Sequence, residues 1–182
     1  MSKPMKESMI STREVLRGNS FSFMSDEVLL PNGRTAQRNY VRYPGAVVII
    51  PFLDDKNIIM IEQFRYSVGE VLLELPAGKI DDPSEPNEAA AYRELLEETG
   101  YQAGAMEYLF SYYPAVGYSS EIIHAFRATK LNKAEQQPDE DEIIEPLVME
   151  FSEALDKVYN GSIRDSKTIL LLLYLQRWYG GK

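Results

Sequence analysis

The chain has 182 residues, 45% of them hydrophobic, and a formal net charge of -9. This length allows one globular domain with a substantial core, and two full domains are not expected. The acidic balance argues against extended nucleic-acid binding, because an acidic surface repels the phosphate backbone. With no cysteine and one histidine, His124, the chain excludes disulfides, thiolate nucleophiles and a polyhistidine zinc site.

The N-terminal residues lack the continuous apolar core of a signal peptide. The apolar run 169–175 is too short to span a bilayer. A chain without cysteine also fits a reducing compartment. We therefore expect a cytoplasmic protein with no membrane partner.

The pattern of apolar residues and turn signals predicts a mixed α/β chain. Residues 1–18 are polar, and we expect only partial order there, supplied by a partner. An N-terminal β-hairpin is expected around Pro31-Asn32-Gly33. In chain order, we predict strands at 21–30, 38–42, 46–53, 58–64 and 71–75, a helix at 86–99, strands at 106–113, 121–129 and 144–151, and helices at 152–159 and 166–179. This order favours helices on both sides of a mixed sheet.

The helix at 86–99 carries an unusual set of acids. Glu94 and Glu98 are four residues apart, so they share one helix face, and Glu97 lies beside them. All three are in the last turns, where the helix dipole disfavours anions. A divalent cation would reverse both penalties, and hard oxygen ligands suit Mg²⁺ or Mn²⁺. The alternative is a solvated acidic face with no ligand.

The same stretch resembles the Nudix hydrolase signature. The matching positions are Gly78, Glu85, Arg93, Glu94, Leu95, Glu97, Glu98, Gly100 and Tyr101. One departure exists, since six residues rather than the family's five separate Gly78 from Glu85. The extra residue falls in the loop before the helix, where an insertion costs little. The resemblance implies the family's α/β/α sandwich around a mixed sheet.

Flanking segments narrow the resemblance. VRYPGAVVIIP, IIMIEQFRY, LLELPAGKI and YYPAVGYSSE are similar to segments of the ADP-ribose and nucleoside-diphosphate-sugar pyrophosphatases, and the likeness covers about 38–179. It implies Mg²⁺-dependent hydrolysis of a nucleotide sugar, with ADP-ribose as the first expectation, to a nucleoside monophosphate and a sugar phosphate. The alternatives are GDP-mannose or another NDP-hexose as substrate, or a nucleotide-sugar-binding sensor without catalysis. Relatives of this type also imply a homodimer, with residues 1–40 as its dimerisation element and 41–182 as the catalytic domain.

By the same resemblance, Glu94 and Glu98 are the first metal ligands. Glu97 would share a metal, and the Ala77 carbonyl would complete the set. Arg93 and Glu85 are expected to form an ion pair that orients the loop and helix, with Gly78 supporting the loop.

The general base must come from elsewhere, because the metal occupies the carboxylates of the helix. In the enzymes that this chain resembles, a glutamate on the loop before the last strand often serves. Matching that loop puts Glu142 first and Glu140 second, and Glu121 is a third candidate. The alternative is that the loop acids are merely exposed.

For substrate binding, the resemblance points to Arg65, and Arg38 and Arg42 could serve the same end. The alternative for Arg65 is a strand-end surface ion pair. Two roles are possible for the aromatic side chains of the first strands. They could stack on a nucleobase or pack in the core or an interface, and the residues concerned are Phe21, Phe23, Tyr40 and Tyr43. His124 is expected to be a packed strand residue rather than a ligand.

Overall fold

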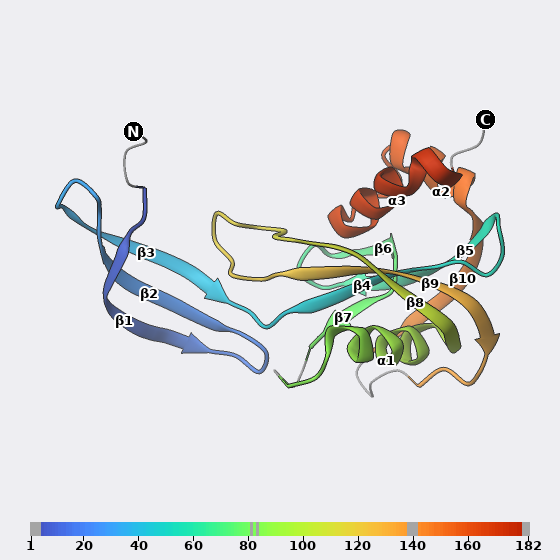
Figure 1. Cartoon of the computed structure of the whole chain (residues 1–182), viewed down its shortest axis with the longest axis horizontal. Coiled ribbons are helices and arrows are strands. Elements are labelled where there is room, and N and C mark those ends of the chain that lie inside the picture. Colours follow the sequence, from blue (N-terminus) through green and yellow to red (C-terminus); the bar gives the residue numbers. More distant parts are fainter. Residues whose placement is uncertain (1–4, 81, 83, 138–141, 180–182) are drawn as a thin grey trace. The chain divides into compact units, whose positions relative to one another are not determined.

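The structure is a computed structural model that describes residues 5–80, 82, 84–137 and 142–179 (Figure 1). The chain divides into two compact units. The first unit consists of Met1–Gly45 and Tyr113–Ile122, and the second of Ala46–Tyr112 and Ile123–Lys182. Residues 1–40 as a dimerisation element and 41–182 as a catalytic domain remain predictions.

The first unit is built on an antiparallel sheet with the order β1 (Ser8–Arg17), β2 (Ser22–Leu29) and β3 (Thr35–Arg42). Its β2–β3 pair is the hairpin expected around Pro31-Asn32-Gly33. The expectation that a partner orders residues 1–18 is wrong for 8–17, because β1 pairs with β2 of its own chain from Ser8↔Leu29 to Arg17↔Ser22. Every residue of β1 is exposed, so this strand shows no buried-exposed alternation that a sequence pattern could reveal.

The second unit contains two further sheets. A four-stranded mixed sheet has the order β7 (Ala77–Lys79), β4 (Ala46–Pro51), β9 (Ile123–Lys133) and β8 (Tyr101–Tyr112), and only its β4–β9 pair is parallel. An antiparallel sheet has the order β10 (Ile144–Glu150), β5 (Asn57–Arg65) and β6 (Glu70–Glu74). Its helices are α1 (Asn87–Thr99), α2 (Phe151–Tyr159) and α3 (Ser166–Tyr179). The three-residue strand β7 was not predicted, and Glu121 precedes β9 rather than starting it.

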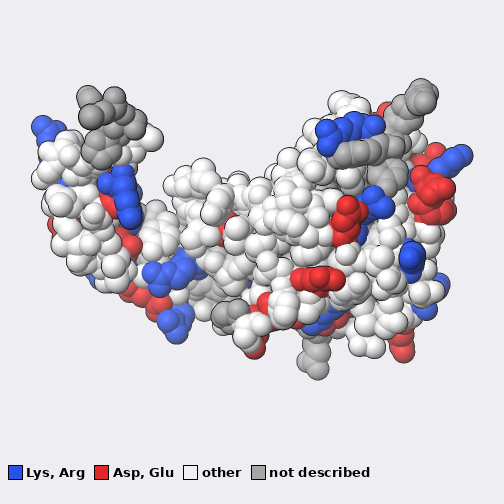
Figure 2. All heavy atoms as spheres, viewed as in Figure 1, with Lys and Arg blue, Asp and Glu red and all other residues white. Residues whose placement is uncertain are grey.

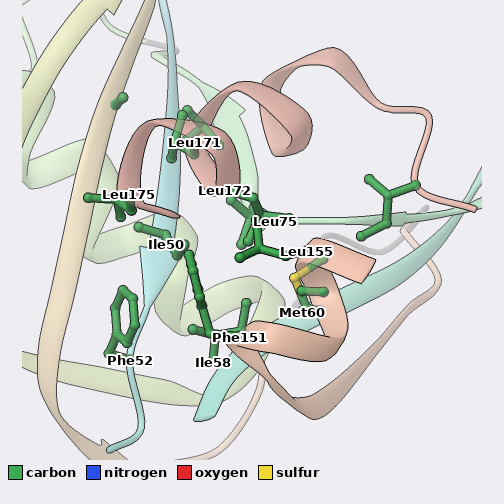
Figure 3. Close-up of a cluster of buried hydrophobic side chains, with 14 of the residues drawn as sticks. Ile50, Phe52, Ile58, Met60, Leu75, Phe151, Leu155, Leu171, Leu172 and Leu175 are labelled. Carbon is green, nitrogen blue, oxygen red and sulfur yellow. The ribbon is translucent and has the colours of Figure 1, made fainter. Parts of the chain in front are cut away.

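Strand β4 is buried at all of its positions, and its alternating side chains contribute to two cores. Val47 and Ile49 pack in a cluster that includes residues of α1. Val48 and Ile50 belong to the larger cluster drawn in Figure 3, which gathers residues of β5, α2 and α3. Helix α1 therefore covers one face of the mixed sheet, and α2 and α3 cover the other, as the α/β/α expectation required.

On the face drawn in Figure 2, basic and acidic side chains of the described residues are interspersed, and no continuous basic tract crosses either unit there. Within the described part of the chain, no helix is long and apolar enough to cross a membrane.

Candidate metal and catalytic site

Helix α1 presents the acidic residues, and its ends are set by local sequence. Pro86 has extended backbone angles (φ -60°, ψ 136°) and precedes the first turn. Gly100 ends the helix in the left-handed conformation (φ 70°) and donates its N–H to the Leu96 carbonyl at 2.9 Å. Between them, the fully buried Ala90 and Ala91 are small enough to let the helix approach β4 closely. The glutamates in the following turns are thus held against the sheet.

Glu94 and Glu98 are buried, with only 8% and 2% of their surface exposed. Burial raises the pKa of Glu98 to about 8, although the N–H of Ala77 donates to its Oε2 at 2.8 Å and favours the charged form. Burial likewise raises the pKa of Glu94 to about 7, against the opposing effect of Arg93. Nearby negative charges also raise the pKa of both carboxyl groups, because they oppose ionisation. The pair is therefore an electrostatically strained site that a cation would relieve.

Gly78 is required for the close approach of β7 to this pair. A Cβ atom added at Gly78 would lie 2.0 Å from both Cδ and Oε2 of Glu94, which is far inside van der Waals contact. Strand β7 itself pairs with β4 through Val47↔Gly78, so it cannot move away without breaking that ladder. The glycine of the motif thus reserves the space that the Glu94 carboxylate occupies.

Arg93 holds the acids of the loop and the helix together. It forms the ion pair with Glu85 that the sequence predicted, with Nε and Nη2 each 3.2 Å from a carboxylate oxygen. Its Nη1 donates to Glu94 at 2.8 Å and to Glu97 at 2.9 Å, and its Nη2 donates to the Lys79 carbonyl at 3.1 Å. These acidic partners, Glu85 first, raise the pKa of Arg93 above its ordinary value. One guanidinium therefore connects β7, the loop and two turns of α1.

The loop that carries the extra residue is folded locally before the helix. The Asp82 carboxylate accepts hydrogen bonds from the backbone N–H and the hydroxyl of Ser84, both at 2.8 Å. The Asp82 carbonyl accepts the N–H of Glu85, also at 2.8 Å. Glu85 still reaches Arg93, so the insertion leaves the ion pair of the motif in place.

Among the predicted bases, Glu142 lies near the buried acids. Its negative charge contributes to the raised pKa of both Glu94 and Glu98. Glu140 lies outside the described residues. Glu121 belongs to the first unit, where its N–H donates to the Ser119 hydroxyl at 3.1 Å. The catalytic roles of all three remain predictions.

Arg65, predicted as a substrate contact with a surface ion pair as the alternative, makes an ion pair, but its partner Glu74 is buried. Its Nε and Nη2 donate to the two carboxylate oxygens of Glu74 at 2.8 and 2.7 Å. In the first unit, Arg38 pairs with Glu7, and Arg42 donates to the Tyr40 hydroxyl at 3.3 Å. Substrate binding by these three arginines remains a prediction. His124 lies in β9 as expected, half-buried, with Nδ1 2.6 Å from the Ser111 hydroxyl.

Sequence reasoning missed the residues that surround Arg65. Glu74 is 1% exposed and also pairs with Lys167, which lies 93 positions further along the chain. Lys167 contacts Asp165 at 3.0 Å, and the Asp165 carboxylate caps α3 by accepting the N–H of Thr168 at 2.9 Å. An aspartate just before a helix is a recognisable cap signal, so Asp165 could have been found. Nothing local in the sequence links Glu74 to Lys167.

The donor set fits a divalent cation in its chemistry. Glu94 and Glu98 offer hard carboxylate oxygens from adjacent turns, and their burial and mutual repulsion favour a bound positive charge. Among the described residues, no three acidic or histidine side chains already form a metal-binding group. Arg93 occupies oxygens of Glu94 and Glu97, so these two carboxylates would exchange that contact for the metal.

Replacement of Gly78 with alanine should abolish metal binding with little loss of stability. The atoms in the way are the carboxylate end of the Glu94 side chain and not backbone, so a change of its rotamer can relieve the clash, but the carboxylate is then displaced. Titration calorimetry with Mn²⁺ and urea denaturation would measure both effects. Gly117→Ala is the control, because its Cβ would meet no atom within 4 Å; wild-type Mn²⁺ affinity in Gly78→Ala would contradict the prediction.

Without a divalent metal, stability should fall as pH rises from about 5 to about 8. Glutamates of the unfolded chain lose their protons near pH ~4.3, whereas folded Glu94 and Glu98 hold theirs to about 7 and about 8. The folded state therefore binds more protons in this window, and raising the pH favours unfolding. Urea denaturation in a chelator at several pH values would test this, and Glu98→Gln should flatten the dependence. Excess Mg²⁺ should weaken or reverse the trend, because it binds the folded ionised state; a stability that rises steadily with pH in the chelator would refute it.

Comparison with known proteins shows similarity far beyond the motif. The NUDIX domain model matches residues 42–171. The chain is 39% identical to a methanol dehydrogenase activator of Bacillus methanolicus, over 97% of this chain and 96% of the relative. It is 36% identical to an ADP-ribose pyrophosphatase of Bacillus subtilis (strain 168), over 96% and 95% of the two chains.

Two further proteins are similar. The chain is 41% identical to a GDP-mannose pyrophosphatase of Cronobacter sakazakii (strain ATCC BAA-894), over 75% of each chain. A solved structure described as an ADP compounds hydrolase superposes with a TM-score of 0.85 at 25% identity, over 99% of this chain and 98% of that chain. The motif, the fold and these matches agree, and the chain belongs to the Nudix family.

Proposed function

We propose that this protein is a Mg²⁺-dependent hydrolase that splits the diphosphate bond of a nucleoside diphosphate sugar, with ADP-ribose as its leading substrate. The products are a nucleoside monophosphate and a sugar phosphate. The observation that carries the proposal is the buried Glu94–Glu98 pair, held by the Ala77 N–H and the space at Gly78. Relatives named as ADP-ribose pyrophosphatase and GDP-mannose pyrophosphatase support the substrate class.

ADP-ribose is favoured over GDP-mannose by the extent of the matches. The ADP-ribose pyrophosphatase aligns over 96% of this chain, whereas the GDP-mannose pyrophosphatase aligns over 75%. The similarity to the former therefore includes a larger part of the chain outside the motif. Its lower identity, 36% against 41%, is spread over this longer alignment. GDP-mannose or another NDP-hexose is the alternative substrate.

In the mechanism, Glu94 and Glu98 would hold the metal, with Glu97 and the Ala77 carbonyl as further ligands. Nudix pyrophosphatases generally need a divalent metal, and Mg²⁺ suits these oxygen donors, with Mn²⁺ as a substitute. The ion would stabilise charge developing on the phosphoryl oxygens and make the attacking water more acidic. Arg93, itself on α1, would still hold the loop through Glu85 and β7 through the Lys79 carbonyl.

Glu142 is the proposed general base. It accepts a proton from water as the oxygen of that water forms a bond to one phosphorus of the diphosphate. The bond from this phosphorus to the bridging oxygen breaks, and the leaving phosphate departs with that oxygen. The proximity of the Glu142 charge to both buried acids supports its choice. Glu140 and Glu121 are the alternative bases.

Substrate contacts are proposed for three arginines. Glu74 holds the Arg65 guanidinium in a fixed orientation, which would suit a rigid diphosphate contact. In the first unit, Arg42 lines a hollow of about 410 Å³ together with Arg17, Phe21 and Tyr43. Aromatic rings beside arginines suit a nucleobase and its phosphates. Arg38 is the third proposed contact.

A homodimer and a cytoplasmic location complete the proposal. Strand β1 leaves Met9, Ile10, Val15 and Leu16 exposed, and a second copy could cover such apolar side chains. A reducing compartment such as the cytoplasm suits a chain without cysteine.

Two other functions remain to be separated from hydrolysis. One is a nucleotide-sugar sensor without catalysis. The other is activation of a dehydrogenase, which is suggested by the name of the Bacillus methanolicus relative and its 39% identity over nearly the whole of both chains. Addition of the protein to a methanol dehydrogenase assay, with and without an inactivating substitution at Glu98, would show whether activation occurs and whether it needs the acidic site.

Incubation with Mg²⁺ and ADP-ribose, GDP-mannose, UDP-glucose or nucleoside triphosphates should yield a monophosphate and a sugar phosphate from one or two nucleotide sugars. Mass spectrometry of the products would rank the substrates. Glu98→Gln should lower turnover by about 100-fold or more, since a metal ligand is lost. Glu88→Gln, an exposed acid on the same helix, is the matched control. Binding of a nucleotide sugar with no turnover by the wild type under Mg²⁺ or Mn²⁺ would support the sensor instead.

Replacement of Glu142 with glutamine should lower kcat by about 100- to 10,000-fold, because a positioned base contributes this much. The loss should lie in kcat rather than in KM. Calorimetry should find that Mn²⁺ still binds, which separates a base from a metal ligand. Glu145→Gln, an exposed acid on β10, is the control. A Glu142→Gln enzyme with kcat within about twofold of the wild type would transfer the role to Glu140 or Glu121.

A further inference from the structure

The chain crosses from one sheet of the second unit to the other at Leu75-Pro76-Ala77. Strand β6 ends with the pair Ile61↔Glu74, and β7 begins at Ala77. The backbone groups of the residues between are taken by elements far apart in the sequence. The Pro76 carbonyl accepts the N–H of Ile49 at 2.9 Å, and the Ala77 N–H donates to Glu98. This crossing therefore places the Ala77 N–H within hydrogen-bond distance of the buried Glu98 carboxylate.

The N–H of Leu75 has its partner in helix α3. It donates to the hydroxyl of Thr168 at 2.8 Å, and Thr168 is fully buried. That hydroxyl donates its own proton to the Asp165 carboxylate at 2.6 Å, so its oxygen is oriented to accept from Leu75. The β5–β6 pairing ends at Glu74, so β5 offers no acceptor for the Leu75 N–H. The Thr168 side chain of α3 supplies that acceptor instead.

An ion network fixes the same turn of α3 to the end of β6. Lys167 pairs with Asp165 and with Glu74, and Glu74 also accepts both hydrogen bonds of Arg65. Although burial of Glu74 opposes ionisation, Arg65 and Lys167 together lower its pKa, so the charged network is favoured. The Leu75 side chain is buried in the same cluster as Leu171 and Leu172 of α3, as Figure 3 shows. Both the backbone and the side chain of Leu75 are therefore held by this helix.

We propose that Thr168 is a positioning residue of the hydrolase, which fixes Leu75 and thereby aims the Ala77 N–H at Glu98. Only Pro76 separates the residue held by Thr168 from the residue that contacts Glu98, and the proline ring restricts φ at that position. With this torsion fixed, fewer rotations between Leu75 and Ala77 can compensate for a displacement of Leu75. Asp165 orients the Thr168 hydroxyl by accepting its proton. The Lys167–Glu74 ion pair holds the end of β6 against the same turn of α3. This inference rests on the proposed function for its kinetic consequence, but not for its structural one.

Thr168→Val tests the proposal, because valine keeps the shape and removes the acceptor for the Leu75 N–H. Amide hydrogen exchange across 75–79 should accelerate by about tenfold or more. Mn²⁺ affinity, measured by calorimetry without substrate, should weaken by about tenfold. With substrate, kcat should fall by about tenfold while KM changes by less than about twofold. Thr168→Ser keeps the hydroxyl and should restore all three quantities toward the wild type.

Leu175→Ala is the stability control, since it empties the core on α3 away from the first turn. It should lower the melting temperature without changing exchange at 75–79 or Mn²⁺ affinity. If Thr168→Val does not fold, Lys167→Met should show the same changes to a smaller extent. The proposal is overturned if Thr168→Val or Lys167→Met leaves exchange and Mn²⁺ affinity at wild-type values, or if the serine variant is as impaired as the valine variant. Failure of the wild type to hydrolyse any nucleotide sugar would reject the proposed function alone, because exchange and Mn²⁺ binding need no substrate.

Discussion

Burial of two like-charged carboxylates on adjacent helical turns is the constraint around which the second unit is arranged. Glu94 and Glu98 are almost entirely removed from water, and desolvation raises the pKa of each toward or above neutrality. Such an arrangement destabilises the folded chain unless a cation or a proton compensates it. Several residues around the pair are small, so that both carboxylates can be buried despite this unfavourable free energy. Ala90 and Ala91 bring the helix to the sheet, and Gly78 leaves the space for a carboxylate.

The part of the site that the sequence predicted is the part built from local chemistry. Spacing along one helix places Glu94 and Glu98 on the same face, and glycine ends the helix at 100, so α1 and its acids follow from a short stretch of chain. The Glu85–Arg93 ion pair spans only eight residues and was also predictable. The strand at β4 was predicted as well, and its burial on both faces is what its continuous apolar run would be expected to give.

The remainder depends on pairings between distant residues that no local pattern encodes. Glu142 is brought toward the acids because Ile144 on β10 pairs with Gln63 on β5, and that register is a property of the whole sheet. Arg65 could be read as a phosphate contact or an ion pair, and only the folded structure shows that Glu74 of β6 lies within its reach. Strand β1 was missed because full exposure removes the alternation by which strands are recognised.

The division between local and distant contacts also bears on substrate choice. Relatives that are named for ADP-ribose, for GDP-mannose and for activation of a dehydrogenase are all similar to this chain. Metal-assisted attack of water on a diphosphate is the same whatever the substituents of the diphosphate are, so the acids of α1 do not by themselves distinguish one sugar or base from another. Discrimination needs contacts to the parts of the substrate that differ, and these contacts must come from residues outside the motif. The hollow of about 410 Å³ beside Arg42 and Phe21 in the first unit is one proposed source of such contacts, since it offers cationic and aromatic groups.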